Sequence, residues 1–268
     1  SLCFEDFKKL QRIYSWGSNI FYHSAALNNI HPTYIQTLLS DQRYNINQLF
    51  DSINFLSKNK SSSFKTTNMM NSIYNTEVEK IGKWNAKEWI KGKKVLIIGS
   101  GPSLSKNKSK ILKFIKNNKP KVIFLNINKF FDEKIATATI ACHEARILGD
   151  LKMYKDLKNP LIIPFSNLNS PIRNALSQNK ILDYSLTLKE NAFEINSNGC
   201  FLKWPLAFAY ALAVVTVGKP KQIYLAGFDG YKNKSDYEQL EMNEIFQFYN
   251  TLSNKVNLKM ITETTYKY

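Results

Sequence analysis

The chain has 268 residues, and 44% of them are hydrophobic, which is enough for a substantial core and excludes a disordered protein. Its formal net charge of +16 favours anionic partners: nucleotides, nucleic acid or a membrane surface with negative headgroups. Lysine is spread along the whole chain, however, and no arginine-rich stripe with interleaved aromatic residues is present, so the composition does not favour nucleic acid.

The cysteines and the hydropathy pattern predict a cytoplasmic protein. Cys3, Cys142 and Cys200 are odd in number and far apart, which indicates a reducing compartment and neither a disulfide framework nor a metal site. No signal peptide is visible, and the chain begins at Ser1 without a methionine, which suggests a piece of a longer protein. The longest apolar stretch, 204–218, is shorter than the ~20 residues that span a bilayer and predicts a buried helix. The charge still allows peripheral contact with an anionic membrane at its inner face.

Residues 1–90 carry helical patterns only. Apolar residues recur three and four positions apart, and His31-Pro32 is typical of a helix start. The expected helices cover residues 4–13, 19–27, 47–56, 69–81 and 84–91. A polar stretch over 58–67 predicts a mobile loop between them. We therefore expect an all-helical N-terminal region over 1–90 that packs on the following domain or forms a homo-oligomer.

From Lys93 onward the pattern changes to alternating strands and helices, which predicts an α/β domain over residues 91–268. The expected strands cover residues 94–98, 121–126, 137–142, 160–164, 181–187, 221–226 and 257–261. The predicted fold class is α/β, a Rossmann-like and mainly parallel sheet with helices on both faces, preceded by the helical region. In such folds ligands bind at the carboxyl ends of the strands, where the loops converge.

A candidate phosphate-binding turn follows the first expected strand. It consists of Gly99, Ser100, Gly101, Pro102 and Ser103. Backbone N–H groups and two serine hydroxyls there can face a phosphate at the start of the next helix. The dinucleotide fingerprint is incomplete, because Leu104 occupies the third glycine position, and no P-loop motif follows. A turn that only ends a strand is equally compatible with the spacing.

Two polar groups elsewhere in the domain are candidate binding residues. Asn126 and Asn128 are two apart, so in extended chain they project to one side and can read a base edge or sugar hydroxyls. Asparagine is also common in turns, which is the simpler interpretation. Ser197, Asn198 and Gly199 come directly before an expected apolar helix over 200–217, which they can cap or at whose N-terminus they can bind an anion.

The loop after the sixth expected strand carries two tyrosines. Gly227, Phe228, Asp229 and Gly230 form a turn at the strand end, and Tyr231 and Tyr237 stand six residues apart around the Lys/Asn-rich loop that follows. Phenol groups can hydrogen-bond a departing phosphate without a proton exchange at neutral pH. Two loop tyrosines that pack on the surface would give the same spacing.

Taken together, these segments resemble the bacterial sialyltransferases that decorate lipo-oligosaccharide with CMP-N-acetylneuraminate as donor. The stretches that carry the resemblance are KKVLIIGSGPSL, NINKFF and NSNGCFLKWPLAFAYALAVVTVGKPKQIYLAGFDGYKNKSDY, within about residues 93–262. They are also similar to domains related to the archaeal 6-hydroxymethylpterin pyrophosphokinase and to flagellin-modifying motility-accessory proteins. A shorter stretch, YSWGSNIFYHSAALNNIHPTYIQTLL, resembles the helical segment after a pyruvate-aldolase-like barrel in bacterial polysaccharide-biosynthesis proteins, which implies an upstream aldolase-like domain.

The resemblance implies a metal-independent, inverting glycosyltransferase. Such an enzyme moves a sialic-acid-like ulosonic sugar from a CMP donor, its substrate, to a bacterial surface glycan or a lipid-linked precursor, and no cofactor or metal ion is implied. The turn from Gly99 to Ser103 would hold the CMP phosphate and ribose, and Asn128 would contact the donor near its leaving group. Tyr231 and Tyr237 would be the paired phenols on the leaving phosphate. The remaining candidate donor-binding residues are Asn126, Ser197, Asn198, Gly199 and Asp229.

The chain departs from this family at two positions. The family uses a histidine after the tyrosine loop as general base, whereas the last histidine here is His143. We therefore take His143 as the candidate catalytic base, and the acidic alternatives are Glu144, Asp236, Glu238 and Glu241. The family arginine before its Thr-Ser-Gly motif is also absent, because Glu194 to Asn196 stand there and Asn198 replaces the serine.

These departures leave two rival functions open. One is a pyrophosphokinase that acts on a pterin-like alcohol with ATP and Mg²⁺, which would need carboxylates near the phosphate turn. Asp132 and Glu133 are the only acids nearby in the sequence. The other is a non-catalytic scaffold that binds a nucleotide or a partner protein. It is considered because the family's histidine base is absent from this chain.

Overall fold

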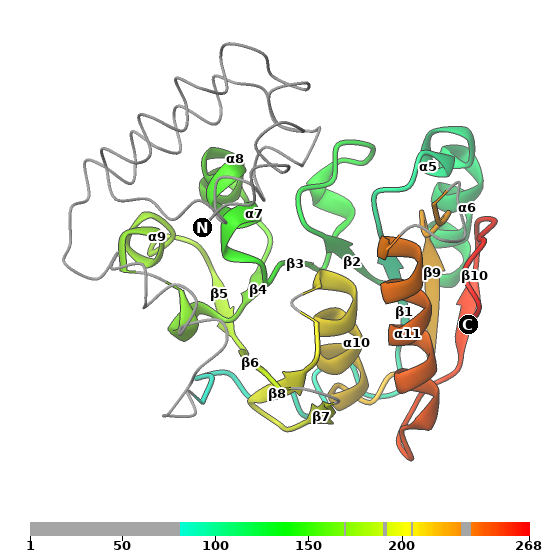
Figure 1. Ribbon diagram of the computed structural model, residues 1–268. Helices are drawn as coiled ribbons and strands as arrows, with labels where there is room; N and C mark the ends of the chain where they lie inside the picture. Colours follow the sequence, from blue (N-terminus) through cyan, green and yellow to red (C-terminus); the bar gives the residue numbers. More distant parts are fainter. Residues whose placement is uncertain (1–80, 169, 190–191, 205, 232–236) are drawn as a thin grey trace, which may run out of the picture. The chain divides into compact units, whose positions relative to one another are not determined.

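The computed structural model describes residues 81–168, 170–189, 192–204, 206–231 and 237–268 (Figure 1). The chain divides into two compact units, and each is described by itself. The first, here called the sheet unit, comprises Val78–Cys142, Asp156–Asn167 and Asn179–Tyr268. In the second, the described residues are 143–155, 168 and 170–178. Most of the predicted helical region lies outside the described residues, so its helices, its loop over 58–67 and its boundary stay predictions.

A seven-stranded parallel sheet forms the centre of the sheet unit. The strand order is β10-β9-β1-β2-β3-β4-β5, and every neighbouring pair is parallel. The strands are β1 (Lys94–Ile98), β2 (Lys121–Leu125), β3 (Ala138–Ile140), β4 (Leu161–Ile163), β5 (Ile181–Asp183), β9 (Gln222–Ala226) and β10 (Leu258–Met260). The predicted α/β fold with a Rossmann-like parallel sheet is therefore confirmed.

Helices cover both faces of this sheet. Successive side chains of a strand point to opposite faces, and β1 and β2 are apolar after their first residue, so both faces need to be covered. Val95 and Ile97 of β1 belong to the core cluster that contains α10 (Ala207–Val217) and part of α11 (Tyr237–Thr251). Leu96 and Ile98 belong to the opposite cluster, with residues of α5 (Ser103–Lys106) and α6 (Lys108–Asn118). The sheet is thus doubly wound.

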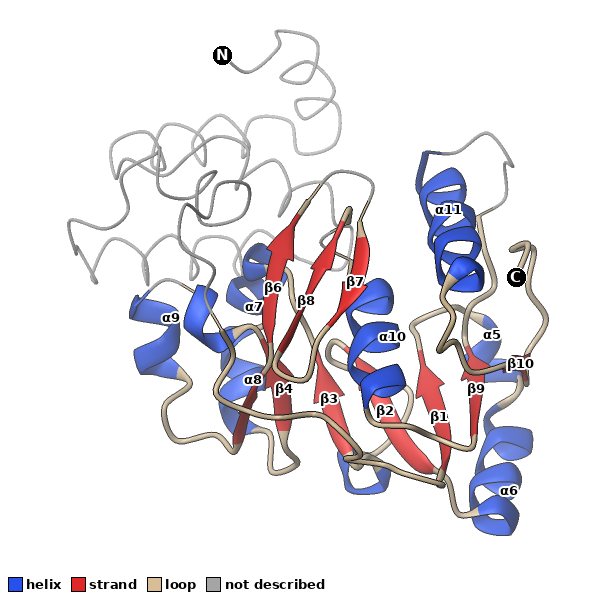
Figure 2. Ribbon diagram, turned by 90° about the horizontal axis from the view of Figure 1, so that it is seen from below, coloured by secondary structure: helices blue, strands red, loops and turns tan. Residues whose placement is uncertain are grey.

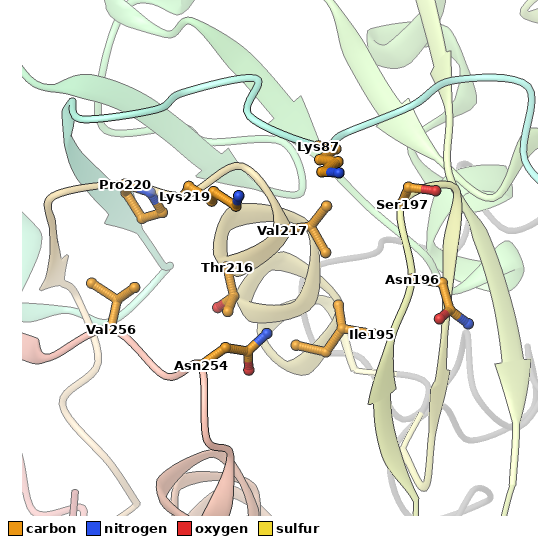
Figure 3. A pocket seen from close by; sticks show the side chains of 10 residues that line it. All are labelled: Lys87, Ile195, Asn196, Ser197, Thr216, Val217, Lys219, Pro220, Asn254 and Val256. Carbon is orange, nitrogen blue, oxygen red and sulfur yellow. The ribbon is translucent and has the colours of Figure 1, made fainter.

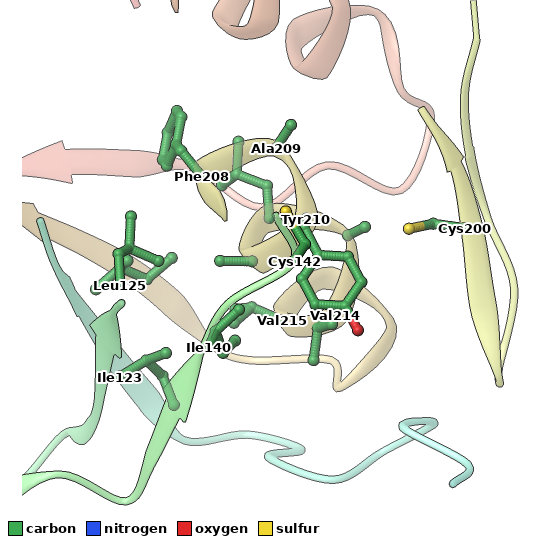
Figure 4. Packing of buried hydrophobic residues seen from close by; sticks show 14 of the residues in the cluster. Ile123, Leu125, Ile140, Cys142, Cys200, Phe208, Ala209, Tyr210, Val214 and Val215 are labelled. Atoms are coloured by element: carbon green, nitrogen blue, oxygen red, sulfur yellow. The ribbon is translucent and has the colours of Figure 1, made fainter. Parts of the chain in front are cut away.

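Helix α10 is buried on all sides, as predicted from its apolar sequence. Nine of its eleven residues are buried. Figure 4 shows Phe208 and Val214 of this helix gathered with Leu125 and Ile140 of the sheet. No helix in the described ranges is both long and apolar enough to cross a bilayer.

A second, three-stranded sheet precedes α10 (Figure 2). Its strand order is β6 (Ser185–Leu188), β8 (Gly199–Leu202) and β7 (Phe193–Ile195). The expected helix over 200–217 is therefore wrong in its first part, and the expected strand over 181–187 divides into β5 and β6. Burial explains the strand at β8, because Cys200 and Leu202 are buried while Phe201 between them is half-buried, which is the alternation of a strand.

The segment from 81 to 92 is not the predicted helix over 84–91 but a series of turns. Ala86 and Ile90 are fully buried and four residues apart, which is why the sequence gives a helical pattern. Glu88 between them has φ 62°, which an α-helix excludes. Backbone hydrogen bonds instead fasten this segment to Ser197, Val217 and Gly218.

The remaining elements are short. They are η1 (Glu133–Ile135), α7 (Glu144–Gly149), α8 (Leu151–Asp156), η2 (Phe165–Asn167) and α9 (Ser170–Ala175).

Candidate functional site

The strand order of the parallel sheet reverses beside β1. Strand β2 lies on one side of β1, and β9 lies on the other. The chain therefore leaves β1 and its neighbour β9 toward opposite faces of the sheet. In open α/β sheets, ligands bind at the carboxyl edge where this reversal occurs. The segments that follow β1 and β9 are Gly99–Ser103 and 227–231, and we call them together the switch site.

Hydrogen bonds join the two segments of the switch site directly. The Gly99 N–H donates to the Ala226 carbonyl at 2.9 Å, and the Gly101 N–H donates to the Gly227 carbonyl at 2.9 Å. Pro102 has no N–H, and the Ser103 N–H donates to the Asp229 carboxylate. In the described part of the chain, the Ser100 N–H is therefore the only N–H of the turn without a hydrogen-bond partner. The turn therefore offers a ligand fewer backbone donors than its sequence predicts.

Asp229 caps helix α5 across the site. Its carboxylate accepts the Ser103 N–H at 2.6 Å through Oδ2 and the Ser103 hydroxyl through Oδ1. A carboxylate is stabilised at a helix N-terminus by the free N–H groups and by the helix dipole. It also stands where the sequence predicts a phosphate. The arrangement suits a neutral group that donates hydrogen bonds to the carboxylate, or a cation.

Residues after β9 and β10 hold Asp229 and its loop in place. The Thr265 N–H donates to the Asp229 carbonyl at 2.9 Å, and the Gly227 N–H donates to Thr262 Oγ1 at 3.0 Å. Gln239 Oε1 accepts the Tyr231 N–H at 2.8 Å, and Gln239 is itself buried. The sequence analysis missed these positioning residues. The only available signal was that Thr262 directly follows the last expected strand.

The close approach of the two segments requires glycine at position 101. A Cβ atom there would lie 2.6 Å from Asp229 Oδ1 and 2.7 Å from the Gly227 carbonyl oxygen. Real Cβ contacts essentially never fall below about 3 Å, so either the turn or the loop would have to move.

We expect Gly101→Val to lower the free energy of unfolding by about 2 kcal/mol, because overpacking forces the backbone to shift. Ser100→Val, at the exposed neighbouring position, is the matched control and should cost less. Denaturant titration of both variants measures the difference. Equal stability of the Gly101 variant and the parent would show that the segments are not packed as described.

The two predicted asparagines differ in what their side chains do. Asn128 Nδ2 donates to the Gly99 carbonyl at 3.1 Å, and its Oδ1 accepts the N–H groups of Phe130 and Phe131. Its amide therefore ties the loop after β2 to the turn after β1. Asn126 is in the left-handed region with φ 56°, is buried, and its Oδ1 has no partner among the described residues. Of the two asparagines, only Asn126 has a side-chain oxygen that could accept a hydrogen bond from a ligand without losing a described partner.

The tyrosine pair is only partly described. Tyr231 lies in the switch site and is 44% exposed. Tyr237 is the first residue of α11, and its side chain lies outside the described residues, as does the segment 232–236 between the two tyrosines. The paired-phenol assignment stays a prediction.

Ser197, Asn198 and Gly199 lie at the other end of the sheet from the switch site. Ser197 and Asn198 lie in the turn between β7 and β8, and Gly199 is the first residue of β8. The Ser197 carbonyl accepts the Ala86 N–H at 2.7 Å, beside the last turn of α10. Asn198 Nδ2 donates to the Gly82 carbonyl at 3.3 Å. The expectation that these residues open the apolar helix is wrong, because α10 starts at Ala207. They do not join the phosphate turn in one site.

His143 belongs to the second unit, so its place relative to the switch site is not described. It precedes α7, and its buried Nδ1 has no partner in the described part of the chain. Burial, and next the nearby Arg146 charge, lower the pKa of His143 to about 4. Its imidazole is neutral at pH 7 and a weak proton acceptor.

The described residues hold no group of three or more His, Cys, Asp or Glu side chains arranged to bind a metal ion. Asp132, which the pyrophosphokinase alternative would use, caps η1 by accepting the Lys134 N–H at 2.9 Å. No protein-family model and no curated protein matches this chain. The resemblance to CMP-dependent sialyltransferases therefore depends on the sequence motifs named above.

Proposed function

We propose that the switch site binds the CMP part of a nucleotide sugar, and that the protein transfers a sialic-acid-like ulosonic sugar from this donor to a bacterial surface glycan. The observation that carries the proposal is the Ser103–Asp229 pair at the reversal point of a parallel sheet. Carboxylates at the carboxyl edge of dinucleotide-binding sheets accept hydrogen bonds from ribose hydroxyls. Asp229 would do the same for the ribose of CMP.

Transfer of the sugar requires stabilisation of the departing phosphate and a base for the acceptor, and the loop after β9 carries side chains of the first kind. The bond between the sugar and the CMP phosphate breaks, the acceptor oxygen bonds to the same carbon from the opposite face, and a base takes the acceptor's proton. Charge builds up on the departing phosphate, and hydrogen bonds that strengthen with that charge accelerate the step. Tyr231 and Tyr237 would donate these bonds, with the exposed N–H of Ser100 as a further donor. The base stays open among His143, Glu144, Asp236, Glu238 and Glu241.

A second candidate function is phosphoryl transfer with ATP and Mg²⁺. The Asp229 carboxylate at the start of α5 favours it, because a carboxylate repels a bare phosphate but can share a divalent cation with one. The two functions differ in the role of the same side chain. In the first Asp229 accepts from a ribose, and in the second it contacts a cation.

Thermal unfolding with nucleotides distinguishes the candidates, because a ligand that binds only the folded protein raises its stability by mass action. We expect CMP and CDP to raise the melting temperature equally with and without Mg²⁺. Stabilisation by ATP that requires Mg²⁺ would favour phosphoryl transfer. No response to CMP, CDP, ATP or GTP would leave the scaffold alternative.

We expect Asp229→Asn to weaken CMP binding about tenfold, since a hydrogen bond to a charged group is worth about 1.5–3 kcal/mol. Calorimetric titration of CMP, with the melting temperature as a check on folding, measures it. The matched control is Asp132→Asn, which alters an exposed cap away from the switch site. Equal CMP affinity of the parent and the Asp229 variant would remove Asp229 from the site.

A further inference from the structure

Six exposed lysines lie at the amino edge of the parallel sheet, opposite the switch site. They are Lys91, Lys93, Lys119, Lys121, Lys219 and Lys221, and we call them the amino-edge lysines. We propose that this edge docks on a membrane surface that contains anionic phospholipids. The inference does not depend on the proposed nucleotide site.

The fold brings these lysines together from three distant segments. Lys121 is the first residue of β2, and the other five precede β1, β2 or β9. These strands are neighbours in the sheet and run parallel, so their amino ends lie at one edge. The Lys221 N–H donates to the Lys93 carbonyl at 2.8 Å, and Lys121 pairs with Val95 in the register of β1 and β2. Neighbouring strands are about 4.8 Å apart, so the three segments form one contiguous surface.

Local charges compensate only part of this cluster. Glu88 is the one acidic partner in the described part of the chain, at 3.0 Å from Lys91 and 3.1 Å from Lys219. These two lysines hold the pKa of Glu88 below its usual value, mainly through their hydrogen bonds to it. The ends of α6 and α10 add about −0.5 charge each at this edge. Together these groups offset about two of six positive charges.

The strand–helix–strand segment that contributes Lys93, Lys119 and Lys121 to this edge is unusually basic even for this chain. Residues 93–131 contain ten lysines and no acidic residue, whereas residues 132–268 contain sixteen basic and fourteen acidic residues. The net charge is therefore concentrated around β1, α6 and β2. A general enrichment in lysine would not produce this asymmetry.

A cavity at the same edge indicates which anionic partner fits. It has a volume of about 340 Å³ and lies between Lys87 and Lys219, and Figure 3 shows their side chains beside Val217. Ile195 and Val256 contribute further apolar wall. A ligand with an anionic head and an apolar body matches both features, and anionic phospholipids have that form. Nucleic acid is the poorer match, because all six positively charged residues of this edge are lysines, whereas arginine is the residue that makes bidentate phosphate contacts.

Flotation with lipid vesicles tests the inference on the whole chain. We expect the parent to bind phosphatidylcholine vesicles only when they contain phosphatidylserine, and to be released at about 1 M salt, where the Debye length is about 3 Å. The variant Lys121→Gln/Lys221→Gln should bind about 25-fold more weakly, because each lysine near an anionic surface contributes a factor of about five.

The matched control is Lys106→Gln/Lys129→Gln, which removes two exposed lysines from segments at the opposite edge. It should retain nearly the affinity of the parent. Equal losses in the two variants would mean that net charge alone drives binding and would overturn the docking surface. Equal binding to vesicles without phosphatidylserine, or binding to single-stranded RNA with none to vesicles, would also overturn it.

Discussion

Replacing either Tyr231 or Tyr237 by phenylalanine is expected to lower the rate of sugar transfer about a hundredfold. If both hydroxyls donate to the departing phosphate, each interaction strengthens as the bond to the sugar breaks. Loss of one preorganised donor of this kind typically costs about 3 kcal/mol of transition-state stabilisation. The dissociation constant of CMP should change much less, because the ground state carries less charge at the phosphate.

The measurement is donor hydrolysis and transfer by both single variants, together with their melting temperatures. Tyr268→Phe is the matched control, because Tyr268 is exposed like Tyr231 and lies at the end of the chain. A purely structural tyrosine would give a lower melting temperature with normal turnover. Unchanged turnover in both variants would rule out the leaving-group assignment and favour the scaffold.

Acidification from pH 6.5 to 4 is expected to cost about 3 kcal/mol of stability through His143 alone. Burial lowers the pKa of His143 from 6.5 to about 4 in the folded protein. The unfolded chain therefore binds the proton first as the pH falls, so stability decreases between these values and levels off below about 4. The difference between these two pKa values corresponds to the stated loss.

His143→Asn should flatten this part of the stability profile, because asparagine does not titrate and is favoured at the residue before a helix. Denaturant titrations of the parent and the variant at several pH values give the difference. The imidazole titration followed by NMR gives the pKa itself. Parallel stability profiles, or an imidazole that titrates near 6.5, would contradict the burial of His143.

The central strands could be predicted from the sequence because they are short, isolated apolar runs. Strand β1 lies between lysines and glycines, and its observed bounds agree with the prediction. Strand β8 could not be recognised, because its residues continue into the apolar run of α10 with no polar interruption longer than Lys203. The spacing of Ala86 and Ile90 suits a helix and a turn equally, and only the backbone contacts to Ser197 and Gly218 decide between them.

The candidate site was predictable in part. The carboxyl-edge rule locates the turn after β1 and the loop after β9, since it depends only on strand order. The Ser103–Asp229 pair was not predictable, because the two residues are 126 positions apart and their contact depends on β1 and β9 being neighbours. The resemblance places Ser197 and Asn198 in the same site, at the position of the family's Thr-Ser-Gly motif. Their sequence suits an anion-binding helix start, but the second sheet places them beside Ala86 and Ser185, away from the phosphate turn.

A crystal structure of the protein with CMP tests the central claim most directly. We predict CMP at the switch site, with a ribose hydroxyl within hydrogen-bond distance of the Asp229 carboxylate and the phosphate near Ser100 and Tyr231. CMP bound elsewhere, such as in the cavity between Lys87 and Lys219, or no CMP at a saturating concentration, would contradict the account.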